Sequence, residues 1–138
     1  MSTKPSAHTA LIPGETLIGV LVVDDQPAVR DGVAQLISCA PLTLREICTA
    51  ASGTEARAIA KRLKPELVIL DADLHGEDGL ALIGQFGQAA LVLVLTSHGD
   101  AATRRLAKSR GAAAFVEKQQ PASELLAAIV QLATTQKH

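Results

Sequence analysis

From Ile18 onward, short apolar runs alternate with stretches whose apolar residues recur at helical spacing. The runs cover Ile18–Val23, Leu44–Ala50, Leu67–Leu70, Ala90–Leu95 and Ala112–Val116. Apolar runs of about four to eight residues are typical of strands that are buried on both faces, as in a parallel sheet. We therefore predict five strands, of which Leu44–Ala50 has the weakest pattern.

Three of the stretches between these runs repeat apolar residues every three or four positions, which forms one face of a helix. The apolar positions are Val29, Val33, Leu36 and Ile37, then Ala56, Ile59, Ala60 and Leu63, then Leu125, Leu126, Ile129 and Val130. Residues that favour helix starts agree with this prediction. Ser52-Gly53-Thr54-Glu55 is a capping-box pattern, and Pro27 and Pro121 suit first helical turns.

A fourth helical segment is predicted to end at a group of basic residues followed by Gly111. Cations stabilise the C-terminal end of a helix dipole, and glycine commonly stops a helix. The basic residues are Arg104, Arg105, Lys108 and Arg110.

Strands that alternate with helices predict an α/β fold with helices on both faces of a parallel sheet. We predict a doubly wound, flavodoxin-like sheet of five strands in the order 2-1-3-4-5, with five helices. The folded domain should cover residues 18–135. Residues 1–17, which are rich in Ser, Thr, Pro and Gly, are predicted to form a flexible N-terminal arm.

Composition narrows the function classes. The chain has 138 residues, enough for one domain, and a net charge of −1, which argues against nucleic-acid binding through a broad basic face. The aromatic residues are Phe86 and Phe115 alone, which disfavours base stacking. The spacing of Cys39 and Cys48 indicates neither a metal site nor a disulfide framework, so we expect free thiols.

No apolar run is long enough to span a membrane, and the N-terminal residues lack the apolar core of a signal peptide. We therefore expect a cytoplasmic protein without membrane contact.

Polar residues stand where four of the predicted strands end. Asp24-Asp25 follows the first strand, Asp71 the third, Thr96-Ser97 the fourth, and Lys118 the fifth. Ligands of such sheets bind beyond the carboxyl ends of the strands, near the switch in strand order. We therefore expect three carboxylates to cluster there, with a hydroxyl and an ammonium facing them.

This cluster has an excess of negative charge. Two carboxylates about 4 Å apart repel by about 1 kcal/mol in water and about 4 kcal/mol at an effective dielectric constant near 20. A hard divalent cation such as Mg²⁺ would offset that charge, and a carboxylate nucleophile beside it suits phosphoryl transfer. The alternative is structural: Asp24 caps the first helix, Ser97 caps the fourth, and Lys118 lies on the surface. The joint occurrence of these groups at four strand ends favours a site.

With these motifs, residues 18–135 resemble the receiver domains of two-component response regulators. The resemblance rests on Val22-Val23-Asp24-Asp25, Pro65 through Asp71, Gly76 through Leu80, Leu93 through Ser97, and Gly111 through Lys118. It implies a phosphoacceptor switch rather than an enzyme for a separate substrate. The switch would catalyse its own phosphorylation and dephosphorylation and alter the face formed by the fourth helix, fifth strand and fifth helix.

The resemblance also implies a role for each site residue. Asp71 would accept the phosphoryl group from a histidine kinase or a phosphotransfer protein. Asp25, Asp71 and the backbone carbonyl of Asp73 would bind Mg²⁺ directly, and Asp24 would act mainly through water. The phosphoryl oxygens would be held by Thr96 and Lys118.

Further residues are implied to act in switching and in the lifetime of the phosphoryl group. Phe115 would move with Thr96 on activation, and the side chains of Asp73 and His98 are candidates for tuning the lifetime. We do not expect His75 or His98 to ligate a metal, because no partner stands at ligand spacing.

Two further expectations concern partners. Gln119 to Ile129 is similar to DNA-binding regulators of the nitrate-regulator branch, which carry a C-terminal helix-turn-helix. The chain would then be either a stand-alone receiver or a receiver cut from a longer regulator, without nucleic-acid contact of its own. The basic run of Arg104 to Arg110 is either a solvated helix end or a contact for an acidic effector or a second receiver.

Two alternative functions stay open at this stage. One is a receiver-like module that signals without phosphate, although such a module would lose acid-pair, Thr or Lys positions that are all present here. The other is a phosphatase of the haloacid-dehalogenase type, since Asp71-Ala72-Asp73 follows a strand as that family's nucleophile motif does. In that family, however, the acidic pair comes last in the chain.

Overall fold

A computed structural model describes residues 17–74, 78–86, 89–97 and 99–135. Apart from Leu17, the predicted N-terminal arm lies outside the described residues. His75 and His98 also lie outside them.

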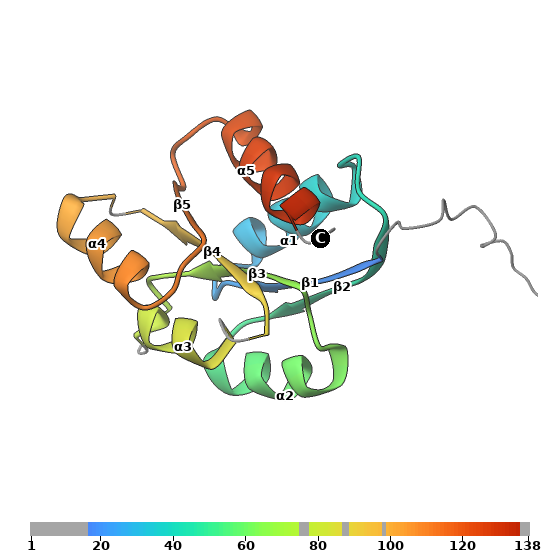
Figure 1. Cartoon of the computed structure of the whole chain (residues 1–138), viewed down its shortest axis with the longest axis horizontal. Helices are drawn as coiled ribbons and strands as arrows, with labels where there is room; N and C mark the ends of the chain where they lie inside the picture. The colour runs from blue at the N-terminus through green and yellow to red at the C-terminus, as the bar shows by residue number, and fades with distance from the viewer. Residues whose placement is uncertain (1–16, 75–77, 87–88, 98, 136–138) are drawn as a thin grey trace, which may run out of the picture.

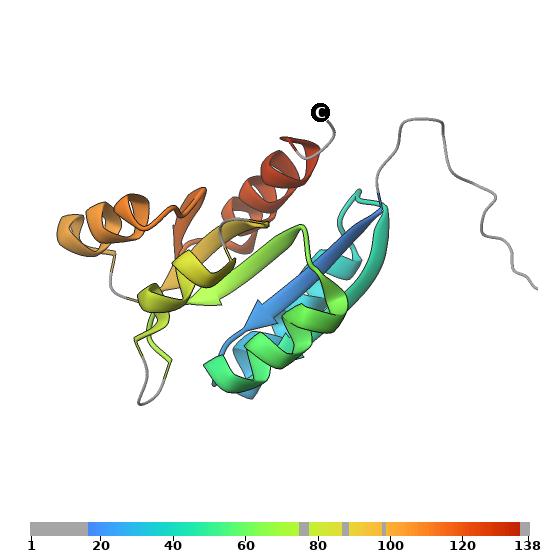
Figure 2. The same cartoon turned by 60° about the horizontal axis from the view of Figure 1, so that its bottom comes forward.

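The five predicted strands form one parallel sheet. They are β1 (Ile18–Val23), β2 (Leu44–Ala50), β3 (Leu67–Asp71), β4 (Leu91–Thr96) and β5 (Ala114–Glu117). Their order is β2-β1-β3-β4-β5, which confirms the predicted topology. β1 and β3 are neighbours, and their arrowheads lie at the same edge of the sheet (Figure 2). The switch in strand order therefore falls between the two strands that end in aspartates.

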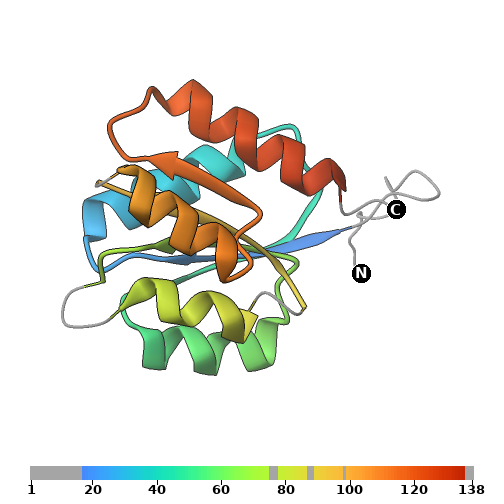
Figure 3. The same ribbon diagram turned by 60° about the vertical axis from the view of Figure 1, so that its left-hand side comes forward.

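Helices cover both faces of the sheet, as predicted. α1 (Pro27–Ser38) and α5 (Ala122–Thr135) lie on one face, and α2 (Gly53–Leu63) and α3 (Ile83–Phe86) lie on the other (Figures 1 and 3). The third helix is short and follows a 3-10 turn, η2 (Gly79–Leu82). α4 (Ala101–Ser109) lies beside β5 and packs through Ala107 on the side of α2 and α3. None of the helices described is both long and apolar enough to cross a bilayer.

Alternate residues of the central strands enter two separate apolar clusters. In β1, Leu21 and Val23 join the cluster beneath α2 and α3, whereas Val20 and Val22 join the cluster beneath α1 and α5. Because successive strand side chains point to opposite faces, a strand buried on both sides must be apolar throughout. This requirement explains why β1 reads as a continuous apolar run and why a one-residue shift in register would be costly.

Several predicted helix ends are confirmed. The Ser52 hydroxyl accepts the backbone N–H of Glu55 at 3.2 Å, and the Glu55 carboxylate accepts the N–H of Ala51 at 2.6 Å. Gly111 follows α4 with a positive φ of 105°, a conformation that glycine adopts without steric cost. Both cysteines are free thiols, Cys39 exposed and Cys48 half-buried.

The prediction that the basic run crowds the end of α4 is wrong for Arg104 and Arg105. Lys108 lies in the last turn and Arg110 is the C-cap residue, but Arg104 and Arg105 lie in the middle of the helix. The Arg104 guanidinium lies over the ring of Phe115 on the neighbouring strand. Arg104 thus contacts β5 instead of the C-terminal end of the helix dipole.

The capping alternative for the strand-end residues is also wrong in part. α4 is capped by Asp100, whose carboxylate accepts the N–H of Thr103 at 2.7 Å, and not by Ser97. Asp24 lies two residues before Gln26, the N-cap residue of α1, and accepts its backbone N–H at 2.9 Å.

The segment after β3 folds back onto the end of that strand at Gly79. A Cβ atom at this position would meet the backbone carbonyl oxygen of Asp71 and would lie 2.8 Å from that of Ala72. The glycine is therefore required by a close backbone approach next to Asp71.

We expect Gly79→Ala to lower the free energy of unfolding by about 1–3 kcal/mol, the usual cost of overpacking a tight site. Thermal or urea unfolding measures the change. Gly84→Ala in α3 is the matched control, because a Cβ there meets nothing within 4 Å and alanine favours the helix. Equal stability of the two variants would contradict the close approach.

Candidate acidic phosphoacceptor site

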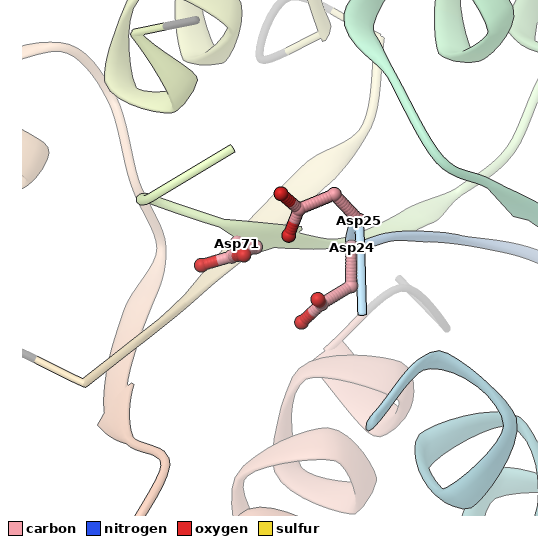
Figure 4. A group of neighbouring side chains, drawn as sticks. All are labelled: Asp24, Asp25 and Asp71. Atoms are coloured by element: carbon pink, nitrogen blue, oxygen red, sulfur yellow. The ribbon is translucent and has the colours of Figure 1, made fainter. Parts of the chain in front are cut away.

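Three carboxylates meet at the carboxyl edge of the sheet, as the strand ends predict. One oxygen from each of Asp24, Asp25 and Asp71 lies within 4.8 Å of the others. Asp24 and Asp25 follow β1, and Asp71 ends β3 (Figure 4). Asp24 and Asp71 are buried, each with a relative exposure of 1%, whereas Asp25 is partly exposed.

Backbone hydrogen bonds beyond the strand ends hold these residues in place. The N–H of Asp24 donates to the carbonyl of Ala50 at 3.0 Å, and that of Ala72 donates to the carbonyl of Leu95 at 3.0 Å. The parallel ladder therefore continues into the first residues of the loops. Because aspartate side chains are short, the backbone of the sheet largely fixes where each carboxylate lies.

Lys118 brings one cation to the buried acids. Its ammonium lies 3.2 Å from Asp24 Oδ2 and 3.3 Å from Asp71 Oδ2, and its side chain is 16% exposed. The backbone N–H of Lys118 donates to the carbonyl of Thr96 at 2.7 Å, which fixes the start of the loop after β5. The predicted encounter between the strand-end lysine and the aspartates is confirmed.

The electrostatic balance of the site favours a proton or a cation. Burial raises the pKa of Asp71, and the charge of Asp24 adds to that effect, although the Asp73 N–H and Lys118 act in the opposite direction. Burial alone would lower the pKa of Lys118, but the carboxylates of Asp71 and Asp24 outweigh it and raise the pKa. At neutral pH the site thus holds a charged lysine against more acidic groups than it can neutralise.

Two buried carboxylate oxygens of the site lack a well-oriented hydrogen-bond donor among the described residues. Asp24 Oδ2 and Asp71 Oδ2 lie within ion-pair distance of Lys118, yet neither accepts a well-oriented hydrogen bond from any residue that the structure describes. Buried carboxylate oxygens left in this way are costly. An all-oxygen set with such oxygens fits a hard divalent cation, and Asp24, Asp25 and Asp71 could hold one.

Thr96 is fully buried at the end of β4, but its hydroxyl contacts a different acid from the three in the cluster. It donates to Asp73 Oδ2 at 3.1 Å, and the Ser97 hydroxyl lies 3.4 Å from the same oxygen. Asp73 is two residues after Asp71, and its backbone N–H donates to Asp71 Oδ1 at 2.9 Å. The Asp73 side chain is exposed, and it accepts a hydrogen bond from the hydroxyl that is predicted to hold a phosphoryl oxygen.

Two residues of the site lie outside the sequence-based prediction. The Gln26 side-chain oxygen lies 3.4 Å from the Lys118 ammonium, and the Arg30 guanidinium donates to the backbone carbonyl of Asp24 at 3.0 Å. Gln26 directly follows the acid pair, and this position only weakly indicates that it belongs to the site. Arg30 reaches back from the first turn of α1 to the end of β1, and neither its residue type nor its position indicated this contact.

The fold and the acidic pocket together define a doubly wound α/β domain with a carboxylate site at its topological switch point. The response regulator receiver domain profile matches residues 20–130, and the chain belongs to that family. It is therefore a receiver domain of the two-component response regulators.

Individual relatives agree with this assignment. The chain is 34% identical to the transcriptional regulatory protein LnrK of Bacillus subtilis and 31% identical to the nitrate/nitrite response regulator NarL of Escherichia coli. Each alignment covers 83% of this chain, but 53% of LnrK and 54% of NarL. The chain thus spans about half the length of these curated relatives.

A solved structure shows the same fold. The crystal structure of a LuxR-family two-component response regulator from Aurantimonas sp. superposes with a TM-score of 0.78 at 29% identity, over 87% of both chains. These comparisons give no support to the haloacid-dehalogenase alternative or to the phosphate-independent module.

We expect Asp71→Asn to stabilise the metal-free protein at pH 7 by about 1–3 kcal/mol, because it removes a buried, poorly satisfied charge. Burial raises the pKa of Asp71, so the folded state keeps this proton to higher pH than the unfolded state. The stability of the wild type therefore falls as pH rises from about 4 through the folded-state pKa, whereas Asp71→Asn lacks this loss.

Urea unfolding in EDTA at several pH values measures the difference. Asp31→Asn, at an exposed acid of α1, is the control and should not show the pH-dependent gain. A wild type more stable than Asp71→Asn at pH 7 would mean that attraction to Lys118 outweighs burial and repulsion.

Proposed function

We propose that this receiver accepts a phosphoryl group on Asp71 from a histidine kinase or a histidine-containing phosphotransfer protein. One observation carries the proposal. Asp71 is buried at the end of β3 with two further acids within 4.8 Å and the Lys118 ammonium 3.3 Å away. A structural ion pair would need a single acid, whereas phosphoryl transfer to a carboxylate needs an acceptor, a cation site and a lysine together.

In the transfer, a carboxylate oxygen of Asp71 attacks the phosphorus of the phosphohistidine. A new O–P bond forms while the P–N bond breaks, and its electron pair returns to the imidazole nitrogen of the donor. Lys118 already lies at the acceptor, where its charge stabilises the phosphoryl oxygens. Thr96 would donate its hydroxyl to another of these oxygens once it leaves Asp73.

Mg²⁺ is the cation that we assign to the acidic pocket. Asp24, Asp25, Asp71 and the backbone carbonyl of Asp73 would hold it, with Asp24 acting mainly through water. When bound, it would neutralise negative charge on the transferring oxygens. This role is consistent with the buried oxygens of Asp24 and Asp71 that lack well-oriented donors among the described residues.

Partners and output follow from the same proposal. LnrK, of which the chain covers 53%, is named a transcriptional regulatory protein, so we propose that the receiver controls a separate output region, which makes any DNA contact. The face formed by α4, β5 and α5 would transmit the signal to that region or to a second receiver. A cytoplasmic location and self-catalysed phosphorylation, without an external substrate, belong to this proposal.

We expect acetyl phosphate to label the wild type in the presence of Mg²⁺ and to leave Asp71→Ala unlabelled. Intact-mass spectrometry detects the added phosphoryl group. EDTA, and Asp25→Ala at the partly exposed acid of the cluster, should each slow labelling by tenfold or more, since each removes cation neutralisation. Labelling of Asp71→Ala at the wild-type rate would disprove the assignment of the acceptor.

The hydrogen bond between Thr96 and Asp73 gives a second test. Asp73→Ala frees the Thr96 hydroxyl for a phosphoryl oxygen, so we expect labelling by acetyl phosphate to be about two- to tenfold faster, the equivalent of one hydrogen bond. Asp73→Asn, which keeps an acceptor oxygen, is the matched variant and should lie closer to the wild type. A slower Asp73→Ala would show that the carboxylate assists the transfer.

Asp73 and His98 also remain predicted tuners of the phosphoryl lifetime. The hydrolysis rate of the phosphorylated protein, measured alongside the labelling of the Asp73 variants, tests that role separately.

A further inference from the structure

We propose that Arg104 of α4 is a positioning residue that holds Phe115 in its present place and thereby restrains phosphorylation of Asp71. The inference rests on the proposed phosphoacceptor function, and on the movement of Phe115 with Thr96 that the resemblance to receiver domains implies. It assigns to one arginine of the basic run a role within the domain itself.

Phe115 lies between the core and the Arg104 side chain. The ring is half-buried in β5 and packs against the apolar cluster beneath α2 and α3. The guanidinium carbon of Arg104 lies 4.6 Å from the ring centroid, within cation–π distance. An inward movement of the ring would separate it from this guanidinium, so the contact favours the present position.

Glu117 holds the Arg104 side chain from a second direction. Its carboxylate lies 3.9 Å from the Arg104 guanidinium and accepts the side-chain N–H of Gln119 at 3.0 Å. Glu117 is two residues after Phe115 in β5, so one guanidinium contacts two side chains on the same face of the strand. Arg104 therefore has less freedom to follow the ring than a solvated arginine would have.

The same contacts reach the loop that follows Thr96. A Cβ at Gly99 would clash with the Glu117 side chain, so the glycine allows the carboxylate to lie against the loop backbone. The loop connects Thr96 of β4 to the first residue of α4, three positions before Arg104. Movement of Thr96 toward a phosphoryl group is thus linked to Arg104 through both the loop and β5.

Arg104 differs in this respect from the other cations of α4. Arg110 pairs with Asp78 at 3.6 Å, on the loop before η2, and Lys108 is exposed in the last turn. Arg105 is the exposed neighbour of Arg104 and carries the same charge. It therefore provides a matched control for electrostatic effects on the acidic pocket.

The test follows Phe115 directly by fluorine NMR. The chain has two phenylalanines, so uniform fluorophenylalanine labelling gives one resonance for Phe115 and one for Phe86. Phe86 is 6% exposed in the core and serves as the internal reference. In Arg104→Ala without phosphodonor, the Phe115 resonance should move toward its position in phosphorylated wild type, and the Phe86 resonance should stay in place.

Labelling by acetyl phosphate and Mg²⁺ provides the functional readout. Loss of an exposed cation–π contact should make Arg104→Ala about two- to fivefold faster than wild type. Arg105→Ala should match the wild type. Glu117→Gln, which weakens the second hold on the guanidinium, should change the rate in the same direction by a smaller factor.

A double-mutant cycle separates positioning from a general structural effect. If Arg104 acts through the ring, Arg104→Ala should not change the labelling rate in a Phe115→Leu background. An equal acceleration in that background, or equal rates for the Arg104 and Arg105 variants with an unmoved Phe115 resonance, overturns the inference. Absence of labelling in the wild type would instead overturn the proposed function.

Discussion

Repulsion among buried carboxylates at the carboxyl edge of the sheet is the constraint on which the site depends. Asp24 and Asp71 are almost completely buried, with Asp25 beside them and the ammonium of Lys118 between the two buried acids. At the dielectric of a protein interior, the negative charge that Lys118 does not offset favours binding of a proton or a metal ion. The same imbalance that costs stability makes the pocket reactive toward a phosphoryl group.

The parallel sheet maintains that arrangement because strand pairing fixes the positions of the acids. β1 and β3 are hydrogen-bonded neighbours, and the ladders that they form with β2 and β4 extend past their last residues to Asp24 and Ala72. Apolar side chains on both faces lock the register, since a slip of one residue would turn every core side chain to the wrong face. The free energy gained by burying the apolar core thus offsets the repulsion between the like charges.

Around the rigid pocket, the groups expected to move are held by weaker, partly exposed contacts. Thr96 bonds to the exposed Asp73 carboxylate, and the half-buried Phe115 lies against Arg104. Exposed contacts of this kind contribute little free energy, so a phosphoryl group with its charge-assisted hydrogen bonds can replace them. A rigid acceptor site surrounded by weakly held side chains is a physical basis for switching between two conformations.

The sequence by itself determined the layered fold, the strand order and the meeting of Asp24, Asp25, Asp71 and Lys118. Strand burial and strand ends are visible as local sequence patterns. The topology rules of parallel sheets then locate the site at the carboxyl edge, next to the switch in strand order. Only the tertiary structure decided that Thr96 bonds to Asp73, that Arg104 faces Phe115 instead of ending its helix, and that Gln26 reaches Lys118. These contacts join side chains on different elements, whose directions depend on loop paths and helix rotation that no periodicity encodes.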